Sequence, residues 1–221
     1  MLKNCSKHSI IKKNAEKFGN EYLFTYLCIV KLKDDEKQNS IIEATLNLIF
    51  TRGLVGLKMS VIAKEAKIAV GTLYIYFDSK EQLLNDIFMR FKRASMEALQ
   101  QEIDDKLPFK ENFKLVWQRY LEFALENPRE ATLLEQLHQS PYLQESVKAE
   151  AETLLMPIKK LLDKGKQLDE IKEIDNEILM AFLSGSINQL ARKFYEKQIN
   201  ATPNNIEEIF LMAWHSVKKE F

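Results

Sequence analysis

The chain has 221 residues, 46% of them hydrophobic and 29% charged, which is the composition of a soluble globular protein long enough for a substantial core. Its 32 basic and 32 acidic residues give a net charge of zero, which excludes a bulk nucleic-acid binder of the histone type, so any nucleic-acid site must be a local patch. Only 6 glycines and 5 prolines favour a mainly helical protein. The 2 cysteines, Cys5 and Cys28, lack metal-ligand spacing and are more typical of a reducing cytoplasm than of a disulfide scaffold.

Residues 1–33 form a basic N-terminal extension in which lysines outnumber acidic residues. Its apolar run, residues 22–30, is too short to cross a bilayer as a helix, and the sequence offers no small-residue cleavage site for a signal peptide. Three interpretations stay open. The segment is a poorly ordered or non-native extension, an additional packing helix, or a basic arm in which Lys31 and Lys33 reach DNA phosphates or the minor groove.

The first regular helix is expected over residues 34–52. Acidic residues at its start suit the positive end of the helix dipole, and apolar residues follow at helical spacing. Gly53 stands where the end of a helix needs a positive φ. A short connection then leads to a second helix that begins near Met59.

Residues 60–84 have the pattern of a helix-turn-helix. A short amphipathic helix is followed by a turn at 67–69 and by a second short helix at 70–76. Leu73 and Phe77, four positions apart, mark the inner face of the second helix. The small residues at its start point elsewhere, as expected where the N-terminal end of a recognition helix enters the DNA major groove.

This stretch closely resembles the DNA-binding signature of the TetR family of bacterial transcriptional regulators, and the resemblance covers residues 36–90. Its most specific part is the run G-T-L-Y-I-Y-F-D-S-K-E at 71–81. The resemblance implies that Thr72, Tyr76 and Lys80 touch phosphates and that the start of the second helix lies nearest the bases. The predicted DNA-binding residues are Lys58, Ala69, Val70, Gly71, Thr72, Ile75, Tyr76 and Lys80.

Three residues depart from the usual pattern of the family. Lys58 stands where a Ser or Thr often caps the next helix, and the missing cap costs about 1 kcal/mol. Lys67 replaces a glycine at a turn that tends toward the left-handed conformation, at a cost of about 1–2 kcal/mol. Ala69 replaces a frequent Ser or Thr, which removes a cap of the recognition helix and one expected phosphate contact.

The rest of the chain is expected to be helical. Ser79 and Gln82 form a capping box that opens a long helix, and prolines divide the chain beyond it. Residues 141–167 are predicted to form one long helix with a kink at Pro157. The expected fold is all-α, with about nine helices after the extension. A three-helix helix-turn-helix domain occupies residues 34–82, and a helical effector-binding and dimerisation domain occupies residues 83–221.

The middle helices contain aromatic and aliphatic residues with a few polar tips, as in an apolar ligand pocket. A plain hydrophobic core accounts for each of these residues at least as well, and the expectation that a ligand binds rests on the resemblance to the family. The candidate effector-pocket residues are Trp117, Tyr120, Phe123, Leu134, Leu137, His138 and Met156.

The helix that starts at Asp175 is apolar on two sides and therefore needs two neighbours. One alternative is complete burial within the monomer. The resemblance implies instead a homodimer in which the last two helices of each subunit form a four-helix interface. The candidate interface residues are Phe182, Gly185, Ser186, Gln189, Phe210, Ala213, Trp214 and Val217.

Catalysis finds little support in the sequence. The three histidines, His8, His138 and His215, lack metal-ligand spacing, and neither a Gly-rich phosphate loop nor a nucleophile elbow is present. We therefore expect no enzyme activity, no cofactor and no metal.

The resemblance implies a cytoplasmic, homodimeric repressor with no membrane partner. It would bind a palindromic operator in double-stranded DNA and leave it when an unidentified small-molecule effector moves the helix that begins at Lys80. The alternative is a helix-turn-helix accessory protein that acts by recruiting partners without a small ligand. Activation in place of repression stays open.

Overall fold

The structure, a computed structural model, describes residues 20–101, 103–104 and 106–220, with side chains from Asp35 onward. Ten helices and no β-strand lie in these ranges, which confirms the all-α expectation. The helices are α2 (Asn20–Arg52), α3 (Met59–Glu65), α4 (Val70–Tyr76), α5 (Lys80–Gln100), α6 (Phe109–Glu126), α7 (Pro128–His138), α8 (Glu145–Leu154), α9 (Met156–Gln167), α10 (Asn176–Tyr195) and α11 (Pro203–Val217).

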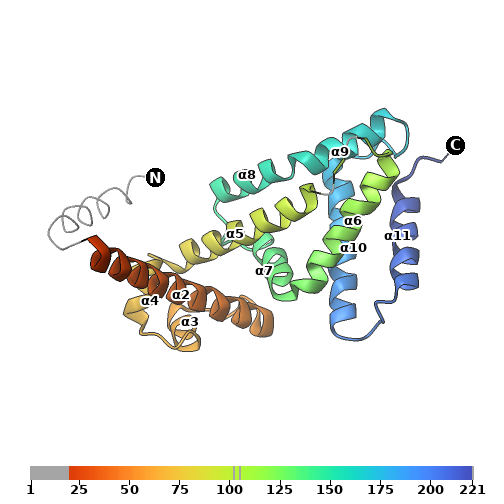
Figure 1. Cartoon of the computed structure of the whole chain (residues 1–221). Coiled ribbons are helices and arrows are strands. Elements are labelled where there is room, and N and C mark those ends of the chain that lie inside the picture. Colours follow the sequence, from red (N-terminus) through yellow and green to blue (C-terminus); the bar gives the residue numbers. More distant parts are fainter. Residues whose placement is uncertain (1–19, 102, 105, 221) are drawn as a thin grey trace.

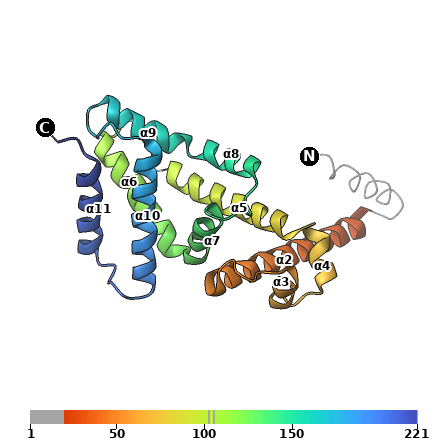
Figure 2. The same cartoon turned by 180° about the vertical axis from the view of Figure 1, so that it is seen from behind.

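The helices are arranged as a head and a body. Helices α2, α3 and α4 lie together at one end of an elongated molecule and form the head (Figure 1). Helices α6, α10 and α11 lie at the other end, and α5 runs from the head into the body, as the opposite view also shows (Figure 2). None of the described helices is long and apolar enough to cross a membrane.

Helix α2 is longer than the sequence analysis predicted. It begins at Asn20 and not at Asp34, because no glycine or proline interrupts residues 20–52. The expected boundary between residues 33 and 34 therefore falls inside a helix. Residues 1–19 lie outside the described part of the chain, and so do the side chains of Lys31 and Lys33, on which the basic-arm hypothesis depends.

The head shows the local features that its sequence predicts. Lys67 has a φ of 56°, in the left-handed region, and neither Lys58 nor Ala69 makes a side-chain cap bond. Ser79 caps α5 by accepting a hydrogen bond of 3.0 Å from the backbone N–H of Gln82. Helix α5 therefore starts at a well-defined point directly after the recognition helix.

Residues 141–167 form two helices and not one kinked helix, so the described part of the chain has ten helices where about nine were expected. Helix α8 ends at Leu154, and α9 begins at Met156 with Pro157 in its first turn. Proline cannot donate a hydrogen bond to the carbonyl group four residues earlier, and its ring clashes with that group, so the helix is interrupted there.

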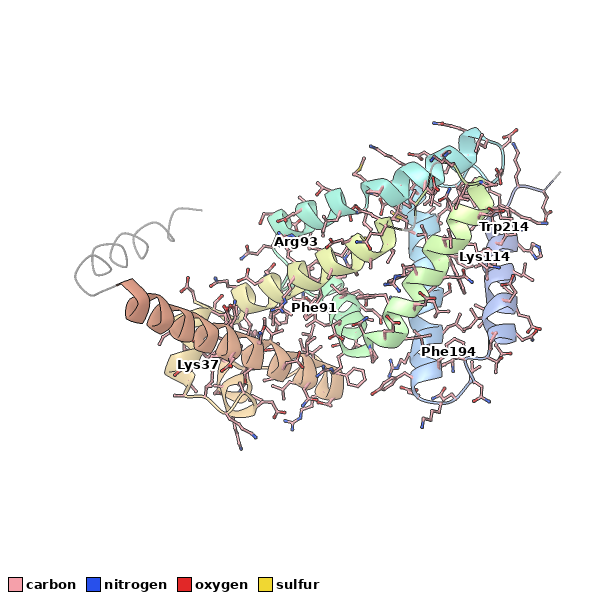
Figure 3. All side chains as sticks on the ribbon, in the orientation of Figure 1. Lys37, Phe91, Arg93, Lys114, Phe194 and Trp214 are labelled. Carbon is pink, nitrogen blue, oxygen red and sulfur yellow. The ribbon has the colours of Figure 1, made fainter. Side chains whose placement is uncertain are left out.

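The body has a hydrophobic core rich in aromatic rings. Phe113 of α6 packs against Trp214 of α11 in a tilted arrangement, with ring centres 5.7 Å apart. Lys114 of α6 forms an ion pair of 2.7 Å with Glu207 of α11, and the labelled Lys114 and Trp214 lie where these helices face each other (Figure 3). Helix α11 is therefore attached to α6 by its aromatic face.

The core of the head is completed by later parts of the chain. Leu133 and Leu137 of α7, Leu143 of the α7–α8 connection and Ala151 of α8 belong to the same buried cluster as the helix-turn-helix. Each of them is at most 6% exposed. The hydrophobic core of the head therefore crosses the boundary expected after residue 82.

Candidate nucleic-acid interface and ligand cavity

The recognition helix α4 presents a short exposed face. Leu73 is completely buried beneath it, whereas Ile75 is 77% exposed, and Val70 and Tyr74 are exposed as well. Gly71 is exposed beside them, and a Cβ atom placed on it would meet nothing within 4 Å. The packing of the protein therefore gives no reason for a glycine here, whereas close approach of another molecule does.

The other predicted DNA-binding residues lie within α4 or close to it in the sequence. Lys58 and Ala69 are exposed at the N-caps of α3 and α4, and Thr72 is half-buried within α4. Tyr76 is also half-buried and packs against the core of the head, so its ring has a structural role as well.

Lys80, the first residue of α5, contacts a residue far along the chain. Its Nζ donates a hydrogen bond of 3.0 Å to the Tyr142 hydroxyl and lies 4.1 Å from the centre of the Tyr142 ring. Tyr142 belongs to the α7–α8 connection, residues 139–144. No local pattern predicts this contact, because 62 positions separate the two residues.

Asn85 attaches the same connection to α5. Its amide nitrogen donates hydrogen bonds of 2.6 Å to the Glu81 carbonyl and 2.8 Å to the Tyr142 carbonyl, and its Oδ1 accepts one of 3.0 Å from the Gln144 N–H. Asn85 is only 5% exposed, so both of its N–H donors and its oxygen are satisfied within the protein. The start of α5 and the α7–α8 connection are therefore fixed to each other.

A cavity of about 400 Å³ lies in the body and is lined by residues of α5, α6, α7, α9 and α10, with Glu152 from α8. Its wall is mainly aromatic and aliphatic. Five of the seven residues predicted to form an effector pocket line it: Trp117, Tyr120, Phe123, Leu134 and His138.

The other two residues predicted to form an effector pocket lie outside the cavity wall. Leu137 is completely buried in the core of the head, because it is on the face of α7 that packs against α2. Met156, the first residue of α9, is 47% exposed and is not part of the cavity wall.

Several polar side chains interrupt the apolar wall of the cavity. The Tyr120 hydroxyl donates a hydrogen bond of 3.1 Å to Asn188 Oδ1, and burial raises the pKa of this hydroxyl. Glu152 and Glu177 also line the cavity, and both form ion pairs with Lys159, at 2.9 and 2.6 Å. Hydrogen bonds to these carboxylates raise the pKa of Lys159 to about 12.

Lys92 of α5 is a cavity residue that the sequence analysis missed. It lies four positions after Phe88 and four before Met96, and all three line the cavity. Burial lowers the pKa of Lys92, and the charge of Glu152 opposes that effect. A lysine inside an otherwise apolar helical stripe is the sequence signal that could have identified it.

Helix α7 has one face in the head and another at the cavity. Leu133 and Leu137 are buried in the core of the head, whereas Leu134 and His138 line the cavity. An ion pair of 3.0 Å between Arg129 of α7 and Glu43 of α2 adds a contact at the surface. Helix α7 therefore contacts both the cavity and α2.

The outer face of α10 and α11 carries exposed apolar side chains. Ile178 and Phe182 of α10 are 62% and 55% exposed, and Met212 of α11 is 72% exposed. Gly185 and Gln189 are exposed and Ser186 is half-buried. All four residues of α10 that were predicted to form the dimer interface are therefore at least partly exposed on a single protomer.

The four interface residues predicted on α11 are buried within the protomer. Phe210, Ala213, Trp214 and Val217 are at most 8% exposed within the protomer, because this face of α11 packs against α6. The outward face of α11 contains Leu211 and Met212 instead.

The family is decided by two sequence models that match most of the chain. One, described as bacterial regulatory proteins of the tetR family, matches residues 41–87. The other, described as a tetracyclin repressor-like C-terminal domain, matches residues 108–218. The chain belongs to the TetR family. This confirms the resemblance seen in residues 36–90 and makes the protein a helix-turn-helix transcriptional regulator.

Several known proteins resemble this regulator over nearly their whole length. A Haemophilus influenzae HTH-type transcriptional regulator is 28% identical over 180 residues, which are 81% of this chain and 94% of the relative. The fatty acid metabolism regulator protein of Bacillus subtilis is 26% identical over 187 residues, 81% of this chain and 96% of that protein. A TetR-family structure from Marinobacter aquaeolei VT8 is 26% identical and superposes with a TM-score of 0.77, over 86% of this chain and all of that one. All three are named as regulators.

Proposed function

We propose that this TetR-family regulator is a homodimeric cytoplasmic repressor. It dissociates from operator DNA when it binds a small, mainly apolar effector. The observation that carries the proposal is that one helix, α7, lines the cavity with one face and completes the core of the head with another. An accessory role through recruited partners alone gives no reason for a cavity of about 400 Å³.

The DNA-contacting surface is the exposed face of α4 with Lys58 and Lys80 beside it. Residues 34–82 are the DNA-binding unit in this proposal, and residues 83–221 are the effector and dimerisation unit. No Arg, Asn or Gln lies on α4, so sequence would be read through apolar contact with thymine methyl groups and through DNA shape. Val70 and Ile75 supply the apolar contacts.

The effector is a mainly apolar small molecule that fits among the aromatic and aliphatic residues of the cavity. A volume of about 400 Å³ lies within the range of small-ligand sites. The Bacillus subtilis relative is named a fatty acid metabolism regulator protein, so fatty acids and their derivatives are the first ligands to test.

Release would follow from linkage between the two sites. A ligand lowers operator affinity only if it binds more tightly to the conformer with lower DNA affinity, and a hundredfold effect needs a difference of about 2.7 kcal/mol. Helices α5 and α7 are the elements that both sites share, because each lines the cavity and contributes to the core of the head.

The dimer would form through the exposed apolar face of α10 and α11. Ile178, Phe182 and Met212 leave an unpartnered apolar surface on one protomer. A two-fold axis through this surface would place two recognition helices on a palindromic operator, with half-sites about one DNA turn, roughly 34 Å, apart or somewhat more.

Selection of bound duplexes from a random DNA pool, followed by footprinting, tests the proposal. We expect a palindromic site, and we expect long-chain fatty acids or their derivatives to reverse the retardation of that duplex. Ile75→Glu should abolish binding, whereas Leu168→Glu, which also places a charge on an exposed apolar position, should not. Failure to enrich any duplex would refute DNA binding, and a bound duplex that no apolar ligand releases would refute effector control.

A further inference from the structure

The contact between Lys80 and Tyr142 bears on how the head holds DNA. Lys80 is the first residue of α5, so its ammonium lies at the positive end of a helix dipole, where a cation is destabilising and an anion is favoured. No carboxylate pairs with Lys80 in the part of the chain that the structure describes, and its hydrogen bond and its ring contact both come from Tyr142. Among the described residues, the Lys80 ammonium therefore has no counter-ion.

Tyr142 contacts the Lys80 ammonium without bringing a negative charge to it. The phenolic oxygen accepts one N–H of the ammonium and the ring attracts the charge, but a neutral tyrosine does not neutralise it. An ammonium has three N–H donors, so two are left for another acceptor. A carboxylate at this position would instead form an ion pair that an incoming phosphate has to break.

The position of Tyr142 is fixed by the buried Asn85, which bonds to the Tyr142 carbonyl and to the Gln144 N–H. The same connection begins at Gln139, which lines the cavity. The α7–α8 connection, which carries Tyr142, is therefore bonded to α5 through Asn85 and reaches the cavity wall at Gln139.

We propose that Tyr142 is a positioning residue for DNA binding, which holds the Lys80 ammonium in place, still charged, so that a backbone phosphate of the duplex accepts its two remaining N–H donors. This inference rests on the proposed DNA-binding function of the head. Tyr142 itself touches no DNA in this arrangement, and its effect on binding passes through Lys80.

The test is a double-mutant cycle with full-length protein and a fluorescein-labelled duplex enriched from the random pool, measured by anisotropy over a range of salt concentrations. Tyr142→Phe keeps the ring and removes the hydrogen bond, and we expect binding about two- to fivefold weaker. Lys80→Ala should lower the slope of log affinity against log salt by about 0.9, the value of one phosphate contact. Tyr142→Phe should lower the slope by a fraction of that amount, and it should have no effect in the Lys80→Ala background.

Two matched variants separate positioning from general effects. Tyr195→Phe removes a hydroxyl for which the structure shows no hydrogen bond in the described residues, and Lys110→Ala removes a cation from the distant α6; neither should alter the affinity. An unchanged affinity in Tyr142→Phe overturns the proposal, and so does an equal loss with and without Lys80. Tighter binding by Tyr142→Phe also overturns it, since Tyr142 would then compete with phosphate. If the wild-type chain enriches no duplex at all, it is the proposed function that fails.

Discussion

Leu137 and His138 are consecutive residues at the end of α7, yet they lie in different parts of the molecule. Leu137 is completely buried in the core of the head, and His138 lines the cavity of the body. The pair Leu133 and Leu134, one turn earlier, is divided in the same way. A single short helix therefore contacts both a ligand-sized cavity and the hydrophobic core of the head.

Replacing a leucine by alanine on each of the two faces of α7 should lower the free energy of unfolding by different amounts. Leu137→Ala leaves a cavity in the core of the head and should lower the free energy of unfolding by about 2–5 kcal/mol. Leu134→Ala enlarges an existing cavity and should lower it by less, while changing the affinity for an apolar effector. Urea denaturation and ligand titration of the two variants test this. Equal destabilisation would contradict the division of α7 into two faces.

Gly71→Ala should weaken DNA binding without lowering the stability of the folded protein. The new methyl group meets nothing within 4 Å, and alanine favours a helix, so stability should be unchanged or higher by up to about 1 kcal/mol. If the backbone of α4 approaches DNA at this point, the affinity for the selected duplex should fall about fivefold or more, which corresponds to one lost groove contact of about 1–3 kcal/mol. Thermal unfolding and anisotropy measure the two quantities. A variant that binds DNA as tightly as the wild type would remove Gly71 from the interface.

Lys92→Met should stabilise the folded protein at neutral pH. Burial lowers the pKa of Lys92 in the folded state from its ordinary value of 10.5, so the folded protein holds this proton less tightly than the unfolded chain. The charged side chain therefore opposes folding below its folded-state pKa, and the penalty fades as the pH rises through that pKa toward 10.5. Methionine has a similar length and no charge.

The measurement for Lys92→Met is the difference in thermal midpoint between variant and wild type across that pH range. The advantage of the variant should be largest at neutral pH and shrink as the pH rises. Lys110→Met, on the exposed surface of α6, is the matched control and should show no comparable pH-dependent gain. A lower midpoint for Lys92→Met at neutral pH would contradict the assigned burial.

Phe182→Glu should shift the protein from dimer to monomer. It places a charge at the centre of the apolar surface of α10, where a partner subunit would have to bury it without a counter-ion. Light scattering at micromolar concentration should report a dimer for the wild type and for Leu168→Glu, and a monomer for Phe182→Glu. DNA affinity should fall when dimerisation is lost, since a single head contacts only one half-site. A monomeric wild type would refute the interface.

Several features of this protein could be predicted because they depend on residues close together in the chain. The run at 71–81 predicted the helix-turn-helix, Ser79 and Gln82 predicted the start of α5, and Lys67 was expected to have a positive φ. Caps, turns and helical periodicity act over a few positions, so a single sequence contains them. The family models confirm what this pattern indicated.

Other features were decided by tertiary packing. The sequence shows that α11 has an apolar face, but only contact with α6 determines that Trp214 faces inward and Met212 outward. In the same way, the hydrophobic pattern of α7 cannot distinguish Leu137 from Leu134, because burial against α2 and exposure to a cavity use the same kind of side chain.

The sequence by itself determined that this chain has a TetR-type DNA-binding head, since that motif is local and specific. The tertiary structure alone decided how the head is joined to the cavity. The contact of Lys80 with Tyr142 spans 62 positions, and the core shared by α2 and α7 spans a comparable stretch of chain. Such contacts arise from the way helices pack against each other, which no short-range pattern of residues records.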